Sequence, residues 1–393
     1  MNTVFQKLKG DRVVWMTVLF LGLISLLAVY SSISSLAFKR EGGSTMHFLV
    51  KHGIMLLSGG AIMYYVSKQQ FTIYSRLSQL LIGVMAVLLL LTLLLGSNIN
   101  DASRWITIPI INQSFQTSDP AKVVLIVYLA RVLGKNQGLE WTLRDVLVKL
   151  MAPVGLICGL ILPANFSTAA VLFAVCLIIM FIGQVPMKHM VMIVGAAIGM
   201  FILLLILAKT TPGLLPRLDT WVGRIESFGV EDHDANYQVE HAKIAIASGG
   251  FLPNGPGSGT SRNFLPHPYS DMIYAFIIEE YGSILGGLGL LLLYLILLFR
   301  AVRIASNCAK PFGALAAIGL GLMLVMQAMI NMAVAVNLVP VTGQPLPLVS
   351  MGGTSVWFTC LAIGIMLSVS RGAEEQPSTE VQPDVKRPRT TLA

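Results

Sequence analysis

Charged side chains are scarce in this sequence of 393 residues. They make up 12% of it, whereas they make up about a quarter of an ordinary soluble protein. Hydrophobic residues make up 55%, and the mean hydropathy is +0.76. This composition excludes a soluble globular protein and indicates a chain that crosses a membrane several times.

Cysteine is also rare, and the common catalytic motifs are absent. No pair of the four cysteines, Cys158, Cys176, Cys308 and Cys360, has the spacing of a disulfide or of a metal-binding motif. The sequence contains no H-x-x-x-H, no G-x-S-x-G and no Walker-type phosphate loop. Redox chemistry, zinc or serine hydrolysis and direct use of ATP therefore have no support in the sequence.

Long apolar runs are abundant instead. Because a membrane helix needs about 17 to 25 apolar residues, nine runs are long enough to span, and a tenth, at about 120–135, is short and weak. We predict an all-α polytopic membrane protein of about ten helices, since an even number returns both termini to one side. The nine long runs are 13–36, 47–66, 77–96, 146–163, 166–184, 188–208, 272–299, 313–337 and 346–370.

The placement of lysine and arginine predicts the orientation. Ten of these residues lie in short connections on the side of the termini, and five lie in short connections on the other side. Because basic residues are enriched in cytoplasmic loops, we expect both termini in the cytoplasm and the protein in the inner cell membrane. The net charge of +8 is then a topology signal and not a nucleic-acid patch.

We expect one transmembrane domain over residues 1–371, with one long connection on the outer face at 209–270. That connection has plausible helical segments, one of them at 236–250, and should fold against the membrane. The segment 337–355 is nearly uncharged and rich in Pro and Gly, so it is predicted to dip toward a cavity that satisfies its backbone. Residues 372–393 have almost nothing apolar to bury and are predicted to be a disordered cytoplasmic tail.

Acidic residues at the start of the eighth span are candidates for chemistry. Asp271 could cap the helix N-terminus, and the same position would hold an ionised carboxylate at the outer membrane surface, which is the state that a general base needs. Glu279 and Glu280 follow about 12 to 14 Å further along the helix. Acids inside a membrane are costly unless they are paired or face water, so these two have a functional role or form a buried salt bridge. The candidate partners are Arg104, Lys122 and Arg131.

Basic residues on the outer face are candidates for binding a diphosphate, which Arg and Lys recognise by charge and hydrogen bonds. Each of them singly is more typical of a solvated side chain. His267, four residues before Asp271, could contact phosphate or a metal ion. The outer cations are Arg104, Lys122, Arg217, Arg224, Lys243 and Arg262.

Four motifs, in order along the chain, resemble the SEDS family, the polytopic glycosyltransferases that polymerise peptidoglycan from lipid II. The resemblance covers nearly all of residues 11–371, and the compact G-P-G-S-G-T-S run is more similar to the cell-division branch than to the elongation branch. The matching motifs are ASRWI with FQTSDPAK (102–122), YQ leading into AIASGG (237–250), FLPHPYSDMIYAFIIEEYG (264–282) and PVTGQPLPLVSMGGTS (340–355).

The resemblance implies that Asp271 is the general base. It would deprotonate the 4-hydroxyl of an incoming GlcNAc while the diphosphate leaves the anomeric carbon of MurNAc. Arg104, Lys122 and Arg262, or a divalent cation such as Mg²⁺ or Mn²⁺, would serve the diphosphate. The implied partners are lipid II, membrane lipid, a class B penicillin-binding protein transpeptidase and other divisome proteins at the septum.

The matching motifs also supply the remaining site predictions. Position 267 is His where the family usually has Glu, Asn165 stands where many members have Asp, and Asp119 replaces a common Glu. The alternatives are an elongation polymerase, a lipid II flippase that uses the intramembrane acids as a proton relay, and a non-catalytic scaffold. Predicted to bind substrate are Arg104, Lys122, Tyr237, Gln238, Lys243, Arg262, His267, Ser270, Ser350, Gly352 and Gly353; predicted to support the site are Trp105, Asp119, Glu279 and Glu280.

Overall fold

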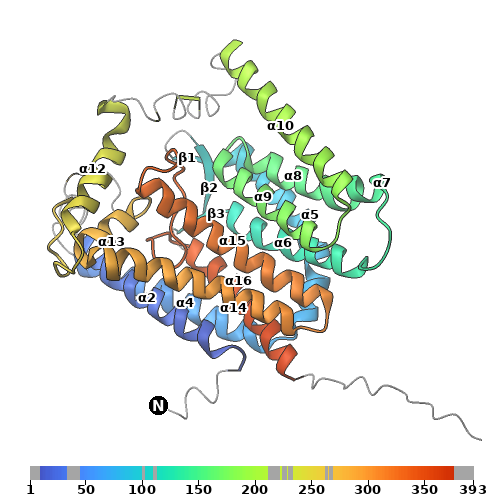
Figure 1. The fold of residues 1–393 in the computed structure, drawn as a ribbon, viewed down its shortest axis with the longest axis horizontal. Coiled ribbons are helices and arrows are strands. Elements are labelled where there is room, and N and C mark those ends of the chain that lie inside the picture. Colours follow the sequence, from blue (N-terminus) through green and yellow to red (C-terminus); the bar gives the residue numbers. More distant parts are fainter. Residues whose placement is uncertain are drawn as a thin grey trace, which may run out of the picture.

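The fold is a bundle of apolar helices (Figure 1). The computed structural model describes residues 9–32, 45–99, 102–108, 113–210, 222–223, 228, 233–261, 264 and 269–375. Helices dominate because a backbone in hydrocarbon must satisfy its own hydrogen bonds. The long helices are α2 (Arg12–Ser32), α4 (Thr45–Lys68), α5 (Phe71–Leu95), α6 (Ser118–Lys135), α9 (Phe166–Ile182), α10 (Met187–Thr210), α14 (Gly289–Asn307), α15 (Pro311–Ala335) and α16 (Ser355–Glu374).

Seven segments of the described chain are long and apolar enough to cross a membrane: α2, α4, α5, α10, the run Ile273–Asn307, α15 and α16. The other three predicted runs correspond to shorter or less apolar helices: α6, α9, and α8 (Ala152–Ile161), which follows the short α7 (Leu143–Asp145) and the π-helix η1 (Val146–Met151). The all-α membrane fold is therefore as predicted, and the count of ten spans stays a prediction.

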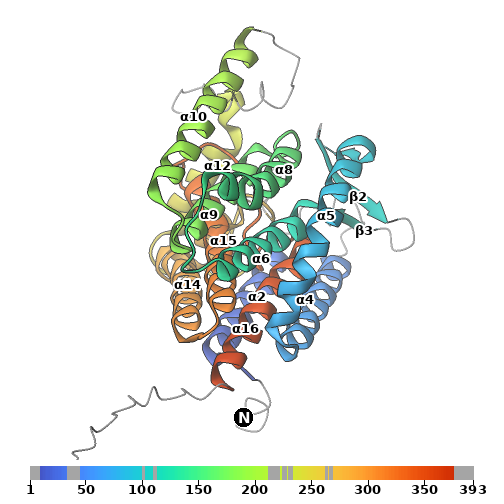
Figure 2. The ribbon, with the colours of Figure 1, turned by 90° about the vertical axis from the view of Figure 1, so that its right-hand side faces the viewer.

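The centre of the bundle is formed by α6, α15 and α16 (Figure 2). Most residues of α15 and α16 are buried, whereas α10 is the least buried of the long apolar helices. The central position of α6 also explains its weak hydropathy, because a helix surrounded by protein can carry polar side chains that lipid would not accept. Its charged residues Asp119 and Lys122 face protein at the start of the helix, and nearly every side chain from Ser118 to Ala130 is buried.

The two ends of the described chain lie on one face of the bundle. Lys9, just before α2, forms an ion pair of 3.5 Å with Glu375, just after α16. Nearby, Asp11 accepts a 2.6 Å hydrogen bond from Nε of Arg300 and also accepts the N–H of Val13 at the start of α2. The predicted return of both ends to one side agrees with these contacts, and the assignment of that side to the cytoplasm stays a prediction.

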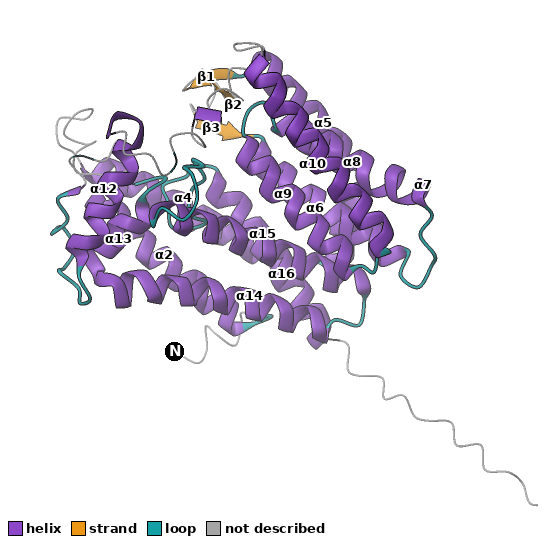
Figure 3. Ribbon diagram, turned by 45° about the horizontal axis from the view of Figure 1, so that its top comes forward, coloured by secondary structure: helices purple, strands orange, loops and turns teal. Residues whose placement is uncertain are grey.

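One small antiparallel sheet, between α5 and α6, was not predicted within this otherwise helical fold (Figure 3). Its strands are β1 (Ser97–Ile99), β2 (Ala102–Ile108) and β3 (Gln113–Gln116), in the order β1-β2-β3. The segment is too short and polar to span a membrane, and the Ile and Thr residues of β2 favour a strand. The predicted site residue Trp105 lies in β2, opposite Gln116 of β3.

The eighth predicted span is interrupted rather than continuous. It consists of α13 (Ile273–Tyr281), the π-helical segment η3 (Gly282–Leu288) and α14. Gly282 has a φ of +74°, and a Cβ there would lie 2.7 Å from the backbone of Leu252. Only glycine fits this crossing, so the chain after α12 (His233–Gly249) packs directly on the break.

The expected helical segment at 236–250 corresponds to α12, which lies beside α13 (Figure 1). A Cβ on Gly249 would lie 2.2 Å from the carbonyl oxygen of Ile278, so the two helices meet there backbone to backbone. Most of the preceding part of the long connection lies outside the described residues. At the other end of the chain, α16 runs to Glu374, three residues into the predicted tail, and residues 376–393 also lie outside the described residues.

Candidate active site

Asp271 lies in a turn just before α13 and is half-buried. Its Oδ1 accepts a hydrogen bond of 2.8 Å from the hydroxyl of Ser270. Its Oδ2 faces Gly343, where an added Cβ would lie 3.6 Å away. The interpretation of Asp271 as the helix N-cap is wrong: Met272 holds that position, and no side chain caps the helix. The carboxylate is therefore not occupied by the first turn of the helix.

The irregular segment between α15 and α16 fastens this turn. Ser350 donates its hydroxyl to the carbonyl of Ser270 over 2.7 Å, and the same hydroxyl accepts the N–H of Leu346 over 2.8 Å. The N–H of Met351 donates to the carbonyl of Tyr269 over 3.0 Å. The predicted site residues Ser270 and Ser350 thus meet at Asp271. The segment predicted to dip inward is buried from Leu346 to Ser350 and partly buried over most of its remaining length.

Gly352 and Gly353 shape the exit of that segment into α16. The N–H of Gly352 donates to the carbonyl of Ser350 over 2.8 Å. Gly353 has a φ of +56°, a backbone conformation that residues other than glycine rarely adopt. Both glycines therefore set the path of the chain beside Ser350.

Two amide side chains of α15, absent from the predicted site, hold the same region. Nδ2 of Asn331 donates to the carbonyl of Asp271 over 2.9 Å and to that of Gln344 over 2.8 Å. Nε2 of Gln327 donates to the carbonyl of Pro345 over 2.9 Å. The sequence did carry a signal for them, because two amides one helical turn apart are unusual in an apolar span and are expected to face polar partners.

Lys122 and Asp119 form an ion pair of 2.9 Å at the start of α6. Both are buried, and Nζ of Lys122 also donates to Oε1 of Gln327 over 3.2 Å. The negative charge of Asp119 lies in the first helical turn, where the helix dipole favours it. The predicted diphosphate-binding cation is thus already paired in this conformation, and it connects through Gln327 to the segment beside Asp271.

Glu279 and Glu280 accept hydrogen bonds from the glycine-rich loop that follows α12. Oε1 of Glu279 accepts the N–H of Thr260 over 2.9 Å. Oε1 of Glu280 accepts the N–H of Gly257 over 2.8 Å and the hydroxyl of Ser31 on α2. Both side chains are buried, so their carboxylates fasten this loop to α13.

Two of the three cations predicted as possible partners of Glu279 and Glu280 have described side chains, and both contact other residues. Lys122 pairs with Asp119, and Arg131 donates to the carbonyl and hydroxyl of Ser75 over 2.9 Å. The side chain of Arg104, and the predicted site residues Arg262 and His267, lie outside the described residues.

Three further predicted site residues lie on α12. Tyr237 is 41% exposed, and the centroid of its ring lies 4.1 Å from that of the His241 ring. Lys243 is exposed and Gln238 is partly buried. They belong to the long connection between α10 and α13, and within the described chain no hydrogen bond or ion pair joins their side chains to Asp271.

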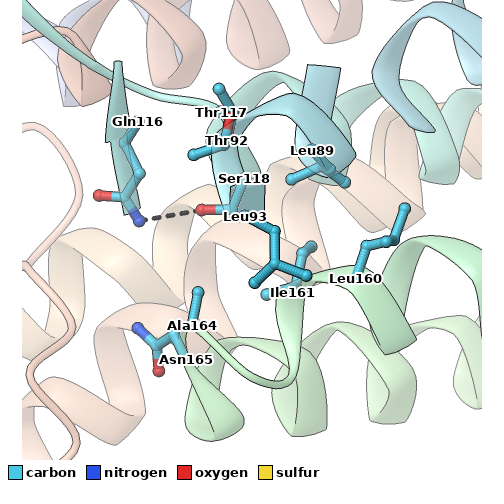
Figure 4. Close-up of a pocket in the computed structure, with 10 residues that line it drawn as sticks. All are labelled: Leu89, Thr92, Leu93, Gln116, Thr117, Ser118, Leu160, Ile161, Ala164 and Asn165. Atoms are coloured by element: carbon cyan, nitrogen blue, oxygen red, sulfur yellow. Dashed lines mark hydrogen bonds between the residues drawn. The ribbon is translucent and has the colours of Figure 1, made fainter. Parts of the chain in front are cut away.

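A small pocket lies where the ends of α5 and α8 meet the starts of α6 and α9 (Figure 4). It leaves about 20 Å³ for water-sized molecules, enough for a water but not for a sugar. Asn165 lines it and caps α9 by accepting the N–H of Thr168 over 3.2 Å. Asn and Asp cap helices about equally well, which accounts for Asn at this position. Among the described residues, no cluster of three His, Cys, Asp or Glu side chains could hold a metal ion.

The family model FTSW_RODA_SPOVE, described as "Cell cycle protein", matches residues 11–375. The chain belongs to this FtsW/RodA/SpoVE family. It is 30% identical over 369 residues to the "Probable peptidoglycan glycosyltransferase FtsW" of Coxiella burnetii, a match that covers 92% of this chain and 96% of that protein. The family assignment confirms the SEDS resemblance that the motifs indicated.

Solved structures agree with the FtsW/RodA/SpoVE assignment at the level of the fold. A chain of the structure described as "Structural coordination of polymerization and crosslinking by a peptidoglycan synthase complex" has a TM-score of 0.71 at 23% identity and covers 93% of this chain and 99% of its own length. RodA of Thermus thermophilus has a TM-score of 0.66 at 23% identity and covers 94% and 99%. The roles of the individual site residues stay predictions.

Proposed function

We propose that this protein is a peptidoglycan glycosyltransferase that polymerises lipid II, with Asp271 as its general base. Two findings support the proposal: the family match extends over nearly the whole chain, and the relatives are named for this activity. The observation that carries it is the position of Asp271. Its carboxylate is half-buried, is held by Ser270, and lies at the end of a span without being used as a helix cap.

With Asp271 as a single base opposite the leaving group, the proposal predicts an inverting transfer. The Asp271 carboxylate accepts the proton of the GlcNAc 4-hydroxyl as that oxygen attacks the anomeric carbon of MurNAc. The bond from this carbon to the diphosphate breaks, and undecaprenyl diphosphate leaves with the electron pair. Because attack and departure occur on opposite faces of the sugar, the α-linked donor gives a β-1,4 glycan. Arg104, Lys122 and Arg262, or a divalent cation, would stabilise the departing charge.

We further propose that the protein acts in cell division, with a class B penicillin-binding protein as its partner. The first relative above is named FtsW, and the connection between α12 and α13 contains the compact G-P-G-S-G-T-S run. The cytoplasmic termini and a septal location belong to the same proposal. The RodA-like elongation role is its alternative.

Replacing Asp271 tests the proposal. Asp271→Asn keeps the size and the contact with Ser270 but cannot accept a proton, so glycan polymerisation by the full chain with its transpeptidase should fall by about 10²- to 10⁴-fold. Asp145→Asn is the matched control, because Asp145 is a partly exposed carboxylate on α7 that pairs with Lys149 and has no contact with Asp271. Full activity of Asp271→Asn on labelled lipid II would reject Asp271 as the base.

A liposome assay separates this function from lipid II transport. With lipid II only in the outer leaflet, a polymerase oriented toward it makes glycan, whereas a flippase makes none. The flippase hypothesis relies on Glu279 and Glu280 as a proton relay. The hydrogen bonds from the loop to both carboxylates do not favour that role.

A further inference from the structure

Gln327 and Asn331 lie one helical turn apart on α15 and face the segment that precedes α16. Gln327 is 7% exposed and Asn331 is 1% exposed. A buried amide is costly unless it is hydrogen-bonded, and the cost is greatest in an apolar span. We refer to these two residues as the amide clamp.

Asn331 joins two separate parts of the chain. Its Nδ2 donates to the carbonyl of Asp271 over 2.9 Å and to the carbonyl of Gln344 over 2.8 Å. Both partners are carbonyl oxygens and can only accept, so the NH₂ group must face them and both of its protons are used. One side chain therefore sets the position of the Asp271 backbone against the segment beside it.

Gln327 extends the same arrangement by one turn. Its Nε2 donates to the carbonyl of Pro345, the residue next to Gln344, over 2.9 Å. Its Oε1 accepts from Nζ of Lys122 over 3.2 Å, and Lys122 is paired with Asp119. Two consecutive carbonyls of an irregular segment are thus held by two consecutive turns of a helix, and the Lys122–Asp119 pair fixes the orientation of the Gln327 amide.

We propose that the amide clamp positions Asp271 for catalysis. This inference rests on the proposed role of Asp271 as the base. A base must lie within hydrogen-bond reach of the proton that it accepts, and a displacement of about 1 Å can lower the rate by about 10²-fold. Asn331 holds the backbone of Asp271 and not its carboxylate, so both members of the clamp are positioning residues.

A purely structural role predicts a different kinetic result. If the clamp only stabilises the fold, its loss lowers the melting temperature and the amount of folded protein but leaves the kcat of the folded fraction unchanged. If the clamp positions Asp271, its loss lowers kcat by a larger factor than it raises the KM for lipid II, because Asn331 bonds the backbone of Asp271 and not a cation proposed for the diphosphate. The ratio of these two effects therefore separates the roles.

The experiment compares three variants of the full chain, each purified with its transpeptidase and normalised to folded protein. Asn331→Leu is close in size and removes both donors. Gln327→Glu still accepts from Lys122 but cannot donate to Pro345. Asn136→Leu is the matched control, because Asn136 donates to the carbonyl of Val132 at the other end of α6. We expect kcat to fall by about 10- to 100-fold in the first two and to stay at the wild-type value in the control.

The outcomes separate this inference from the proposed function. The inference is overturned if Asn331→Leu and Gln327→Glu both keep the wild-type kcat, or if they raise KM alone, while Asp271→Asn is inactive. If Asn331→Leu does not fold, Gln327→Glu alone decides by the same measure. Full activity of Asp271→Asn would instead reject the base assignment, whatever the clamp variants do.

Discussion

At the scale of the residue, Gly343 sets how closely the chain approaches the Asp271 carboxylate. Its φ is +64°, and a Cβ there would lie 3.6 Å from Oδ2 of Asp271. A methyl group would therefore stand against the oxygen that has to receive a proton. The same methyl group would also strain the backbone, by about 1 to 2 kcal/mol.

Gly343→Ala is expected to lower the polymerisation rate more than Gly138→Ala does, while the two variants lose a similar amount of stability. Gly138→Ala is the control, because Gly138 has a φ of +79° and nothing within 4 Å of an added Cβ. It carries the same backbone strain without the approach to Asp271. Polymerisation rates and melting temperatures of both variants measure the difference. An equal loss of activity in the two would show that strain alone is responsible.

Single residues also show where inference from sequence stops. Asp271 could be found because a carboxylate at the mouth of an apolar span is unusual, but its place in the turn before Met272 depends on bonds from Ser350 and Asn331, which are distant in sequence. Gln327 and Asn331 were visible as amides in an apolar span. Their partners were not, because backbone carbonyls of an irregular segment leave no mark in the sequence.

At the scale of the element, Glu279 connects α13 to the loop after α12. Its Oε1 accepts the N–H groups of Thr260 and Ser261 over 2.9 and 3.2 Å. Removing the carboxylate leaves two N–H groups without this acceptor, and each buried unsatisfied group costs about 1 to 3 kcal/mol.

Glu279→Ala is therefore expected to destabilise the protein by at least about 1 kcal/mol, whereas Glu279→Gln should stay near wild type in stability and polymerisation. The amide oxygen of Gln still accepts the same N–H groups, but Gln cannot carry a proton. Thermal unfolding and the polymerisation assay measure both effects. Loss of activity in Glu279→Gln at unchanged stability would favour a proton-transfer role over the loop contact.

At the scale of the whole molecule, the apolar runs predicted the membrane bundle, because hydrocarbon leaves the backbone few alternatives to a helix. The same logic fails where other forces act. The break at Gly282 arises from the crossing of Leu252, and the sheet between α5 and α6 forms in a stretch too polar to span. The charge of α6 made that helix a weak candidate, although it packs at the centre of the bundle.

The predicted orientation can be tested with a native cysteine. Cys308 follows α14 and is partly buried, and that burial raises the pKa of its thiol above the usual value. Cys158, Cys176 and Cys360 are buried within helices. If the face with the Lys9–Glu375 pair is cytoplasmic, a membrane-impermeant maleimide should spare Cys308 in cells with an intact inner membrane and label it after permeabilisation.

The rate of that labelling should depend on pH. The thiolate is the reactive form, so a raised pKa keeps labelling slow at neutral pH. As long as the pH stays below that pKa, each increase of one pH unit should make labelling about tenfold faster. Lys243→Cys is the control for the opposite face, since Lys243 is exposed on α12. In a Cys308→Ser background, the cysteine at position 243 should be labelled in cells in which only the outer membrane is permeabilised. Labelling of Cys308 under those same conditions would show that the orientation is the reverse of the predicted one. Asp271 would then face the cytoplasm, where the proposed polymerisation does not take place.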